Sequence, residues 1–172
     1  MTPGIVETFN GMPVHYIDAP EALEAAAAGW LQRDVVALDT EFMRVRTFHA
    51  QAALFQVCDG DACFLVDPLA VGDLAPLARL LDARDVLKVM HSCSEDLEVC
   101  DRHLGALPDP LVDTQIVAAF CGYPLSVGYQ KMLAAEFDVQ LGKSETRTDW
   151  LQRPLSPAQI HYAAEDVAFL PG

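Results

Sequence analysis

The sequence has few basic residues for its size. It carries 11 lysines and arginines against 25 aspartates and glutamates, which gives a formal net charge of −14 over 172 residues. Proteins that hold nucleic acids by bulk electrostatics carry a basic surface instead. The composition therefore argues against binding of phosphate backbones through overall charge, but not against a small site in which metal ions supply the positive charge.

Other features that the sequence lacks narrow the class of protein further. No stretch approaches the roughly 20 consecutive apolar residues of a membrane span, and the N-terminus has no basic region followed by an apolar block. The five cysteines, at positions 58, 63, 93, 100 and 121, follow neither a small-scaffold disulfide pattern nor zinc-ligand spacing. The sequence also contains no glycine-rich phosphate loop. We therefore expect a single-domain cytoplasmic protein with reduced, mostly buried thiols.

Apolar runs and turn signals predict several strands. They are expected at residues 14–17, 35–42, 53–58, 63–66 and 86–90, with a short step at 111–112. An Asp59-Gly60 pair between two of these runs predicts a hairpin. The strands at 35–42, 53–58 and 63–66 should therefore form an antiparallel meander.

Helical spacing of apolar residues and start signals predict the remaining elements. Helices are expected at residues 20–32, 74–81, 94–103, 114–120, 127–137 and 157–170. The last has a capping box of Ser156 and Gln159, and Ser92 with Glu95 is one possible box before the helix at 94–103. A hairpin group followed by strand–helix alternation predicts an α/β domain, with a mixed sheet and helices on both faces.

Asp39 and Glu41 lie near the end of the expected strand at 35–42. Residues two apart on a strand project from the same face, about 6–7 Å apart. A single acid where a strand runs into solvent is ordinary. Two acids that follow four apolar residues on a buried strand carry a high desolvation cost unless a positive charge lies between them.

Asp96, Tyr162 and Asp166 are weaker signals when each is taken alone. Asp96 lies in the first turn of an expected helix, where the helix dipole favours any acid, and Glu95 fits the capping role beside it. Tyr162 and Asp166 share one helix face, as a buried tyrosine and a surface acid often do. Together with the strand acids they suit Mg²⁺ or Mn²⁺, and two such ions can clamp the oxygens of a phosphoryl displacement.

Three segments resemble the exonuclease motifs of ribonuclease D, a family in the DEDDy group of 3′–5′ exonucleases. They are Asp39-Thr40-Glu41-Phe42, residues 91–99 and residues 162–167. Residues 113–116 and 143–155 are also similar to this family. The resemblance covers the chain from about Val14 onward and implies a ribonuclease H-like fold, in agreement with the mixed sheet read from the residues.

The resemblance also implies a mechanism and a substrate class. Asp39, Glu41, Asp96 and Asp166 would hold two divalent cations, and Tyr162 would orient the attacking water. The products would be 5′-nucleoside monophosphates from RNA 3′ ends, in the maturation of tRNA or other structured RNA. Family members usually continue into helical nucleic-acid-binding domains. We therefore expect residues 1–172 to be a single exonuclease domain without them, either a naturally minimal enzyme or a fragment.

Basic and aromatic residues outside the acid motifs are candidates for substrate contact. Three cations beside an aromatic residue precede the last helix: Lys143, Arg147, Arg153 and Trp150. They would bind phosphates and stack a base, or else the cations would pair with acids of the same segment and the tryptophan would lie in the core. We expect Lys143 and Arg147 near the substrate.

A second set of substrate candidates lies nearer the acids. Phe42, Gln56 and His91 are expected to flank the terminal nucleotide, although His91 also fits a hydrogen-bonded histidine at a strand end. Three further residues would line the entrance or lie in a solvated loop: Arg44, Arg46 and His49.

Two other functions remain open from the sequence. One is a DNA 3′–5′ exonuclease of the proofreading type, because nothing in the motifs reads the 2′-hydroxyl that distinguishes RNA from DNA. The other is a non-catalytic RNA-binding domain of the same fold. The complete set of acids together with Tyr162 disfavours the second alternative.

Overall fold

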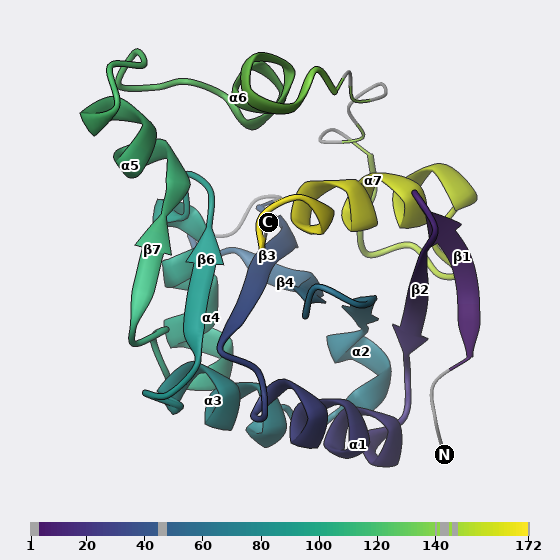
Figure 1. Cartoon of the computed structure of the whole chain (residues 1–172). Helices are drawn as coiled ribbons and strands as arrows, with labels where there is room; N and C mark the ends of the chain where they lie inside the picture. The colour runs from purple at the N-terminus through teal and green to yellow at the C-terminus, as the bar shows by residue number, and fades with distance from the viewer. Residues whose placement is uncertain (1–3, 45–47, 140, 142–144, 146–147, 172) are drawn as a thin grey trace.

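The computed structural model describes residues 4–44, 48–139, 141, 145 and 148–171. Within these ranges, seven strands form one sheet in the order β1-β2-β5-β4-β3-β6-β7 (Figure 1). Their bounds are β1 Ile5–Phe9, β2 Met12–Ile17, β3 Val35–Met43, β4 Gln51–Cys58, β5 Cys63–Val66, β6 Leu87–Met90 and β7 Leu111–Asp113.

The pairing confirms a mixed sheet. Strands β3, β4 and β5 form the predicted antiparallel meander, whereas β2 with β5, β3 with β6, and β6 with β7 pair in parallel. Strand β1 was not predicted. It forms an antiparallel hairpin with β2 across Asn10 and Gly11, which both have positive φ, 49° and 82°. An Asn-Gly pair is a hairpin signal that the strand prediction did not use.

The helices lie where the sequence predicted them, apart from one short addition. Their bounds are α1 Pro20–Trp30, α2 Pro68–Val71, α3 Ala75–Asp82, α4 Ser94–Leu104, α5 Thr114–Phe120, α6 Tyr129–Phe137 and α7 Pro157–Ala168. The unpredicted helix is the single turn α2. The Ser156–Gln159 capping box at α7 is present as expected.

The predicted capping box at α4 was wrong. The residue before the helix is Cys93, and its side chain makes no capping hydrogen bond. Instead Asp113 braces this turn from outside, because its carboxylate accepts hydrogen bonds from the N–H groups of Ser92 and Cys93 at 2.9 and 3.1 Å. Asp113 also caps α5 by accepting from the Gln115 N–H at 2.8 Å, so one carboxylate fixes the starts of two helices.

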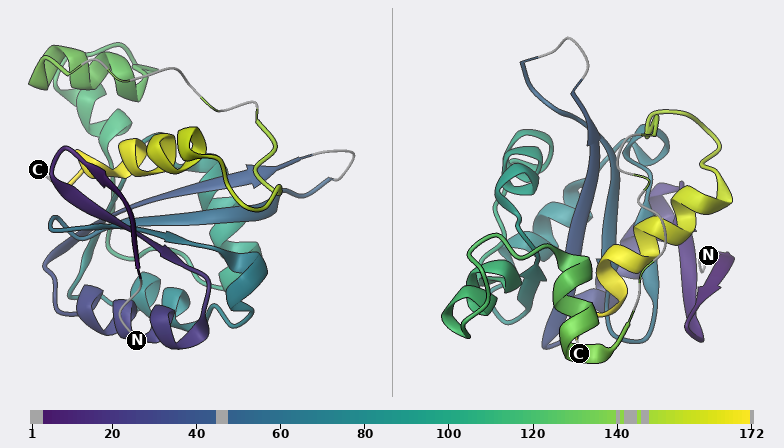
Figure 2. Two further views of the ribbon diagram at one scale, coloured as in Figure 1. Left: turned by 90° about the vertical axis from the view of Figure 1, so that its right-hand side faces the viewer. Right: turned by 90° about the horizontal axis from the view of Figure 1, so that it is seen from above.

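Two apolar clusters cover the two faces of the sheet. One packs α1, α3 and α4 against one face and contains Trp30 and Leu80. The other packs α7 against the opposite face and contains Trp150 and Ala163. Figure 2 shows α7 on one side of the sheet and α1 on the other. Helices therefore lie on both faces, as predicted.

An ion pair fastens the segment before α7 to the sheet. Arg153 donates hydrogen bonds from Nε and Nη2 to Asp67 at 2.6 and 2.8 Å, and from Nη2 to the Ala53 carbonyl at 2.7 Å. The Tyr16 hydroxyl also donates to Asp67, at 2.6 Å. Although burial opposes it, the hydrogen bonds from Arg153 and Tyr16 lower the pKa of Asp67. Arg153 thus pairs with a distant acid, rather than with substrate or with acids of its own segment.

Among the described residues, no helix combines the length and the apolar character that a membrane crossing requires.

Candidate active site

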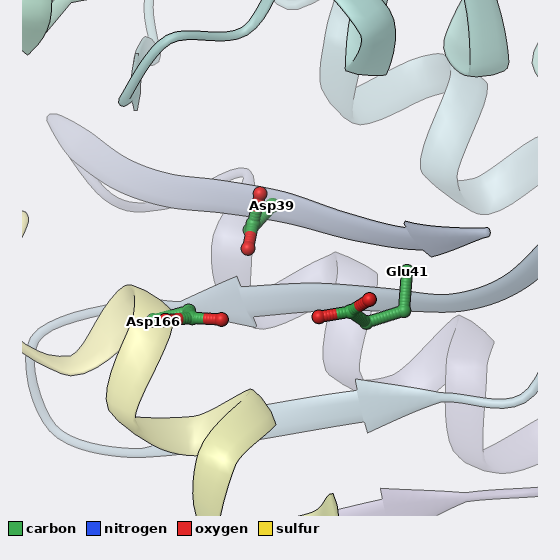
Figure 3. A group of neighbouring side chains, drawn as sticks. All are labelled: Asp39, Glu41 and Asp166. Carbon is green, nitrogen blue, oxygen red and sulfur yellow. The ribbon is translucent and has the colours of Figure 1, made fainter. Parts of the chain in front are cut away.

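Strand β3 and helix α7 bring three acids together. Asp39 and Glu41 project from the face of β3 that α7 covers, and Asp166 lies on α7. One carboxylate oxygen from each lies within 4.8 Å of the other two. Figure 3 shows the three carboxylates facing one another from the strand and the helix. The structure therefore juxtaposes acids from the first and last motifs, as the sequence predicted.

Burial and neighbouring acids raise the pKa of all three carboxyl groups. Burial, and then the charges of Asp96, Asp166 and Glu41, raise the pKa of Asp39 well above its ordinary value. Burial and the charges of Asp166 and Asp96 raise the pKa of Glu41 to about 9. Burial and the charges of Glu165 and Asp96 raise the pKa of Asp166 to about 7. Such a group is stabilised in its charged form only when a cation lies among the oxygens.

Asp96 reaches the cluster from the other side of β3. It is buried in the first turn of α4, and its Oδ1 accepts a hydrogen bond from the Thr40 hydroxyl at 2.5 Å. Asp96 is not one of the three acids whose oxygens lie within 4.8 Å of one another, but its charge raises the pKa of Asp39 and Glu41. Its role as a metal ligand remains a prediction.

Tyr162 lies one helical turn before Asp166 and hydrogen-bonds to it. Burial raises the pKa of Asp166 most, and the hydrogen bond from Tyr162 opposes that rise. Both residues line a small cavity of about 160 Å³. Its full lining is Asp39, His91, Tyr129, Tyr162, Asp166 and Leu170. The cavity therefore places a phenol beside two of the clustered acids, where a water molecule can be held.

His91 lines this cavity with both ring nitrogens already engaged. Its Nε2 lies 3.1 Å from the Val127 carbonyl, which can only accept, and its Nδ1 lies 2.9 Å from the Thr114 hydroxyl. Burial lowers the pKa of His91, which favours the neutral ring with its proton on Nε2. Only the ring face is left for a ligand. The Tyr129 ring lies near it in a tilted arrangement, with ring centroids 5.5 Å apart. Sequence reasoning missed Tyr129, because nothing in its local pattern separates it from a core tyrosine.

The other substrate candidates divide into buried and surface residues. Gln56 has no exposed surface, so the expectation that it contacts a nucleotide was wrong. It sits opposite Asp39 in the β3–β4 register. Trp150 is also in the core, only 1% exposed, so it cannot stack a base. Phe42 is partly buried against the cluster that contains α4.

The basic candidates near the entrance pair with acids of α4. Arg44 lies 3.1 Å from Glu98 and 3.8 Å from Glu95, and His49 lies 3.5 Å from Glu98. Glu95 is therefore a surface acid and caps no helix. Three further candidates lie outside the described residues: Arg46, Lys143 and Arg147.

Comparisons with known proteins agree on one family. A family model described as 3′–5′ exonuclease matches residues 14–171. Ribonuclease D of Pseudomonas paraeruginosa is 49% identical over 157 residues, which is 91% of this chain and 42% of that protein. The crystal structure of Escherichia coli RNase D, described as an exoribonuclease involved in structured RNA processing, has a TM-score of 0.88 at 45% identity.

The alignments with solved structures give the share of each relative's length that this chain matches. The match to Escherichia coli RNase D covers 91% of this chain and 42% of that chain. The catalytic core of RRP6 from Trypanosoma brucei has a TM-score of 0.87 at 26% identity, and the match covers 99% of this chain and 47% of that chain. The chain therefore spans less than half of these relatives, and the shared part contains the carboxylate cluster.

Proposed function

Because this chain belongs to the 3′–5′ exonuclease family, we propose that it is a metal-dependent exoribonuclease, which releases 5′-nucleoside monophosphates from RNA 3′ ends. The observation that carries the proposal is the group formed by Asp39, Glu41 and Asp166, with one oxygen from each within 4.8 Å of the others. By analogy with the structured-RNA processing named for the Escherichia coli relative, the substrates are tRNA precursors or other structured RNAs. Residues 1–172 act as a single exonuclease domain.

The donor set of the cluster fits divalent cations. Carboxylate oxygens are the ligands that Mg²⁺ and Mn²⁺ prefer. Burial, together with the charges of Asp166 and Asp96, raises the pKa of Glu41 to about 9, and a cation among these oxygens would favour the charged form. The residues that would hold two such ions are Asp39, Glu41, Asp96 and Asp166. When bound, the ions supply positive charge at the scissile phosphate and make water a better nucleophile.

The remaining residues position the water and the terminal nucleotide. The Tyr162 hydroxyl, held by Asp166, orients the attacking water in the cavity. The ring face of His91 lies against the terminal nucleotide, with Phe42 at the edge of the site. Lys143 and Arg147 bind the phosphate backbone.

Because the composition is acidic, the metal ions also have to attract the RNA. A chain with a net charge of −14 repels a polyanion, so ions in the cluster provide much of the attraction for RNA. The metal-free protein should therefore bind RNA poorly.

The test uses RNA labelled at its 3′ end, with Mg²⁺ or Mn²⁺ and with a chelator. We expect release of labelled mononucleotide only in the presence of metal. Asp96→Asn should lower the rate by at least about 100-fold, since loss of even an outer-shell partner of a metal costs roughly 10- to 100-fold. Asp101→Asn is the matched control, because Asp101 is exposed on the same helix and should leave the rate unchanged.

Two outcomes would favour the alternatives. Faster degradation of a matched DNA oligomer than of RNA would indicate a DNA exonuclease. If Mn²⁺ produced no mononucleotide, and Asp39→Ala did not change that, the chain would be a non-catalytic RNA-binding domain.

A further inference from the structure

Three sulfur atoms from three strands meet beneath α7, outside the carboxylate cluster. The Sδ of Met12, at the start of β2, lies 3.6 Å from the Sγ of Cys58 and 3.5 Å from the Sγ of Cys63. Cys58 ends β4 and Cys63 begins β5, and the two are direct partners in the antiparallel register. Their thiols hydrogen-bond to each other. Each sulfur therefore contacts the other two.

The three residues differ in burial. Cys58 and Cys63 have no exposed surface, whereas Met12 is partly exposed. Sulfur atoms often fill apolar cores without further purpose. Here, however, the three sulfur atoms contact one another, and the partly exposed Met12 supplies a long, flexible side chain.

The carboxylates nearest to the sulfurs in the sequence, which would be hard oxygen ligands, already pair with an arginine. The nearest acids in the sequence are Asp59 and Asp61, in the hairpin between the two cysteines. Both accept from Arg33 Nη2, at 3.1 and 2.6 Å. This pairing leaves two thiols and a thioether as the donors that face one another. Thiolate and thioether ligands select soft ions, of which Cu(I) is the clearest case.

The spacing of the sulfurs suits a three-coordinate ion. Metal–sulfur bonds of about 2.3 Å in a flat triangle need sulfurs about 4.0 Å apart. The two measured edges that meet at Met12 are 3.6 and 3.5 Å, so small rotations of these side chains would open the triangle enough. Zn²⁺ would need a fourth ligand, which the three sulfurs do not supply. We propose that Met12, Cys58 and Cys63 form a three-sulfur site for Cu(I).

Binding at this site is ligand exchange without electron transfer. Each thiol gives up its proton to solvent and forms a sulfur–copper bond, and the Met12 thioether binds as a neutral donor. Copper stays as Cu(I), two protons are released, and the occupied site carries one negative charge. The hydrogen bond from Cys63 lowers the pKa of Cys58, while the same bond and burial raise the pKa of Cys63. Cys58 is thus the more acidic of the two thiols, and both protons leave as the ion binds.

The site is separate from the proposed exonuclease chemistry but lies against the same helix. Cys63 Sγ is 3.8 Å from the Ala164 carbonyl of α7. The proposal does not rest on nuclease activity, and its test does not use activity as a readout.

The experiment is an oxygen-free titration of the whole chain with Cu(I), in competition with a chromophoric Cu(I) chelator. The wild type should withdraw one Cu(I) per chain and release two protons per ion. Cys58→Ser should abolish this. Met12→Leu keeps the apolar volume and should weaken binding by more than the roughly 10- to 100-fold typical of an outer-shell loss. Cys121→Ser is the control, because Cys121 is exposed and remote in sequence.

The outcomes separate the proposal from its rivals. It is overturned if wild type takes no copper from the chelator, if Met12→Leu binds as tightly as wild type, or if Cys121→Ser loses the ion. Far-UV circular dichroism shows whether Cys58→Ser is folded. If it is not, Met12→Leu and the proton count decide the question.

Discussion

The Thr40 hydroxyl donates a hydrogen bond to Asp96 Oδ1 at 2.5 Å, which joins strand β3 to the first turn of α4. Thr40 lies between Asp39 and Glu41 in the sequence, and its side chain projects to the opposite face of the strand. One strand therefore presents two acids on one side and holds a third acid from the other side. This bond fixes where the Asp96 carboxylate can lie.

Thr40→Val should weaken both folding and metal binding. The substitution keeps the shape but removes the donor, and a buried hydrogen bond to an acid contributes about 1.5 kcal/mol or more. We expect the free energy of unfolding in urea to fall by about that amount. The Mn²⁺ concentration at half-maximal binding should rise, because the lost bond had lowered the pKa of Asp96 against the effect of burial. Thr40→Ser, which retains the hydroxyl, should restore both values. An unchanged Mn²⁺ midpoint in the valine variant would refute the positioning role.

The metal-free protein should lose stability as pH rises. The folded-state pKa is about 7 for Asp166, against an ordinary value of 3.8, and about 9 for Glu41, against 4.5. For each acid, between its ordinary pKa and its folded-state pKa, the folded state binds more protons than the unfolded state. The free energy of unfolding therefore falls as pH rises through this range. Melting temperatures in chelator should therefore drop from about pH 5 to about pH 9, and Mn²⁺ should reduce the drop.

The matched variants for this pH dependence are Glu41→Gln and Asp101→Asn. Glu41→Gln should flatten the profile above pH 7, because the folded-state pKa is about 9 for Glu41 but only about 7 for Asp166. Asp101→Asn, at an exposed site, should leave it unchanged. If Glu41→Gln kept the wild-type slope, Glu41 would not be the group that causes the loss of stability above pH 7.

Gln56→Leu should stabilise the protein. The Gln56 side chain has no exposed surface, and neither its Nε2 nor its Oε1 has a hydrogen-bond partner among the described residues. Replacing a buried, unsatisfied amide by an apolar group of similar size removes a desolvation cost of about 1–3 kcal/mol. Urea unfolding should show part of this gain. Gln159→Leu is the contrast, because the Gln159 amide bonds Ser156, Thr148 and Asp149 and its loss should destabilise. A loss of stability in Gln56→Leu would indicate that the amide has a partner in solution.

Asp67→Asn should loosen the attachment of α7. The variant leaves the Arg153 guanidinium without its acid, and breaking a buried ion pair in this way costs roughly 3–5 kcal/mol. Arg153 retains some exposure, 23% of its side chain, so we expect the lower end of that range. Thermal unfolding measures the effect. Asp61→Asn breaks an exposed pair with Arg33 and should cost less than about 1 kcal/mol. Equal effects of the two variants would mean that burial of the Asp67 pair contributes nothing.

Local signals in the sequence predicted most of the elements and the direction of several side chains. The period of two along β3 placed Asp39 and Glu41 on one face, and the helical period placed Tyr162 over Asp166. The Ser156 capping box marked the start of α7. Strand β1 was missed because its apolar residues are largely exposed at the sheet edge, with Ile5 63% and Val6 48% exposed, so they show no clear buried face.

Features that depend on distant partners could not be read from the sequence. Arg153 binds Asp67 across 86 positions of the chain, so its role as a structural clamp has no local signature. Gln56 looked like a polar residue near the acids, yet the packing of α7 on β4 leaves it fully buried. The brace that Asp113 forms at the start of α4 likewise depends on β6 and β7 lying side by side.

The carboxylate cluster joins β3 to α7, two elements that are far apart in the sequence, and this separation matters during protein synthesis. Domains made on the ribosome tend to fold as units. The strand acids Asp39 and Glu41 emerge long before Asp166, and they cannot form the group until α7 has docked. A nascent chain therefore lacks the complete set of acids until α7 has emerged. The layout of the fold delays assembly of the carboxylate cluster until α7 has been synthesised and has docked on the sheet.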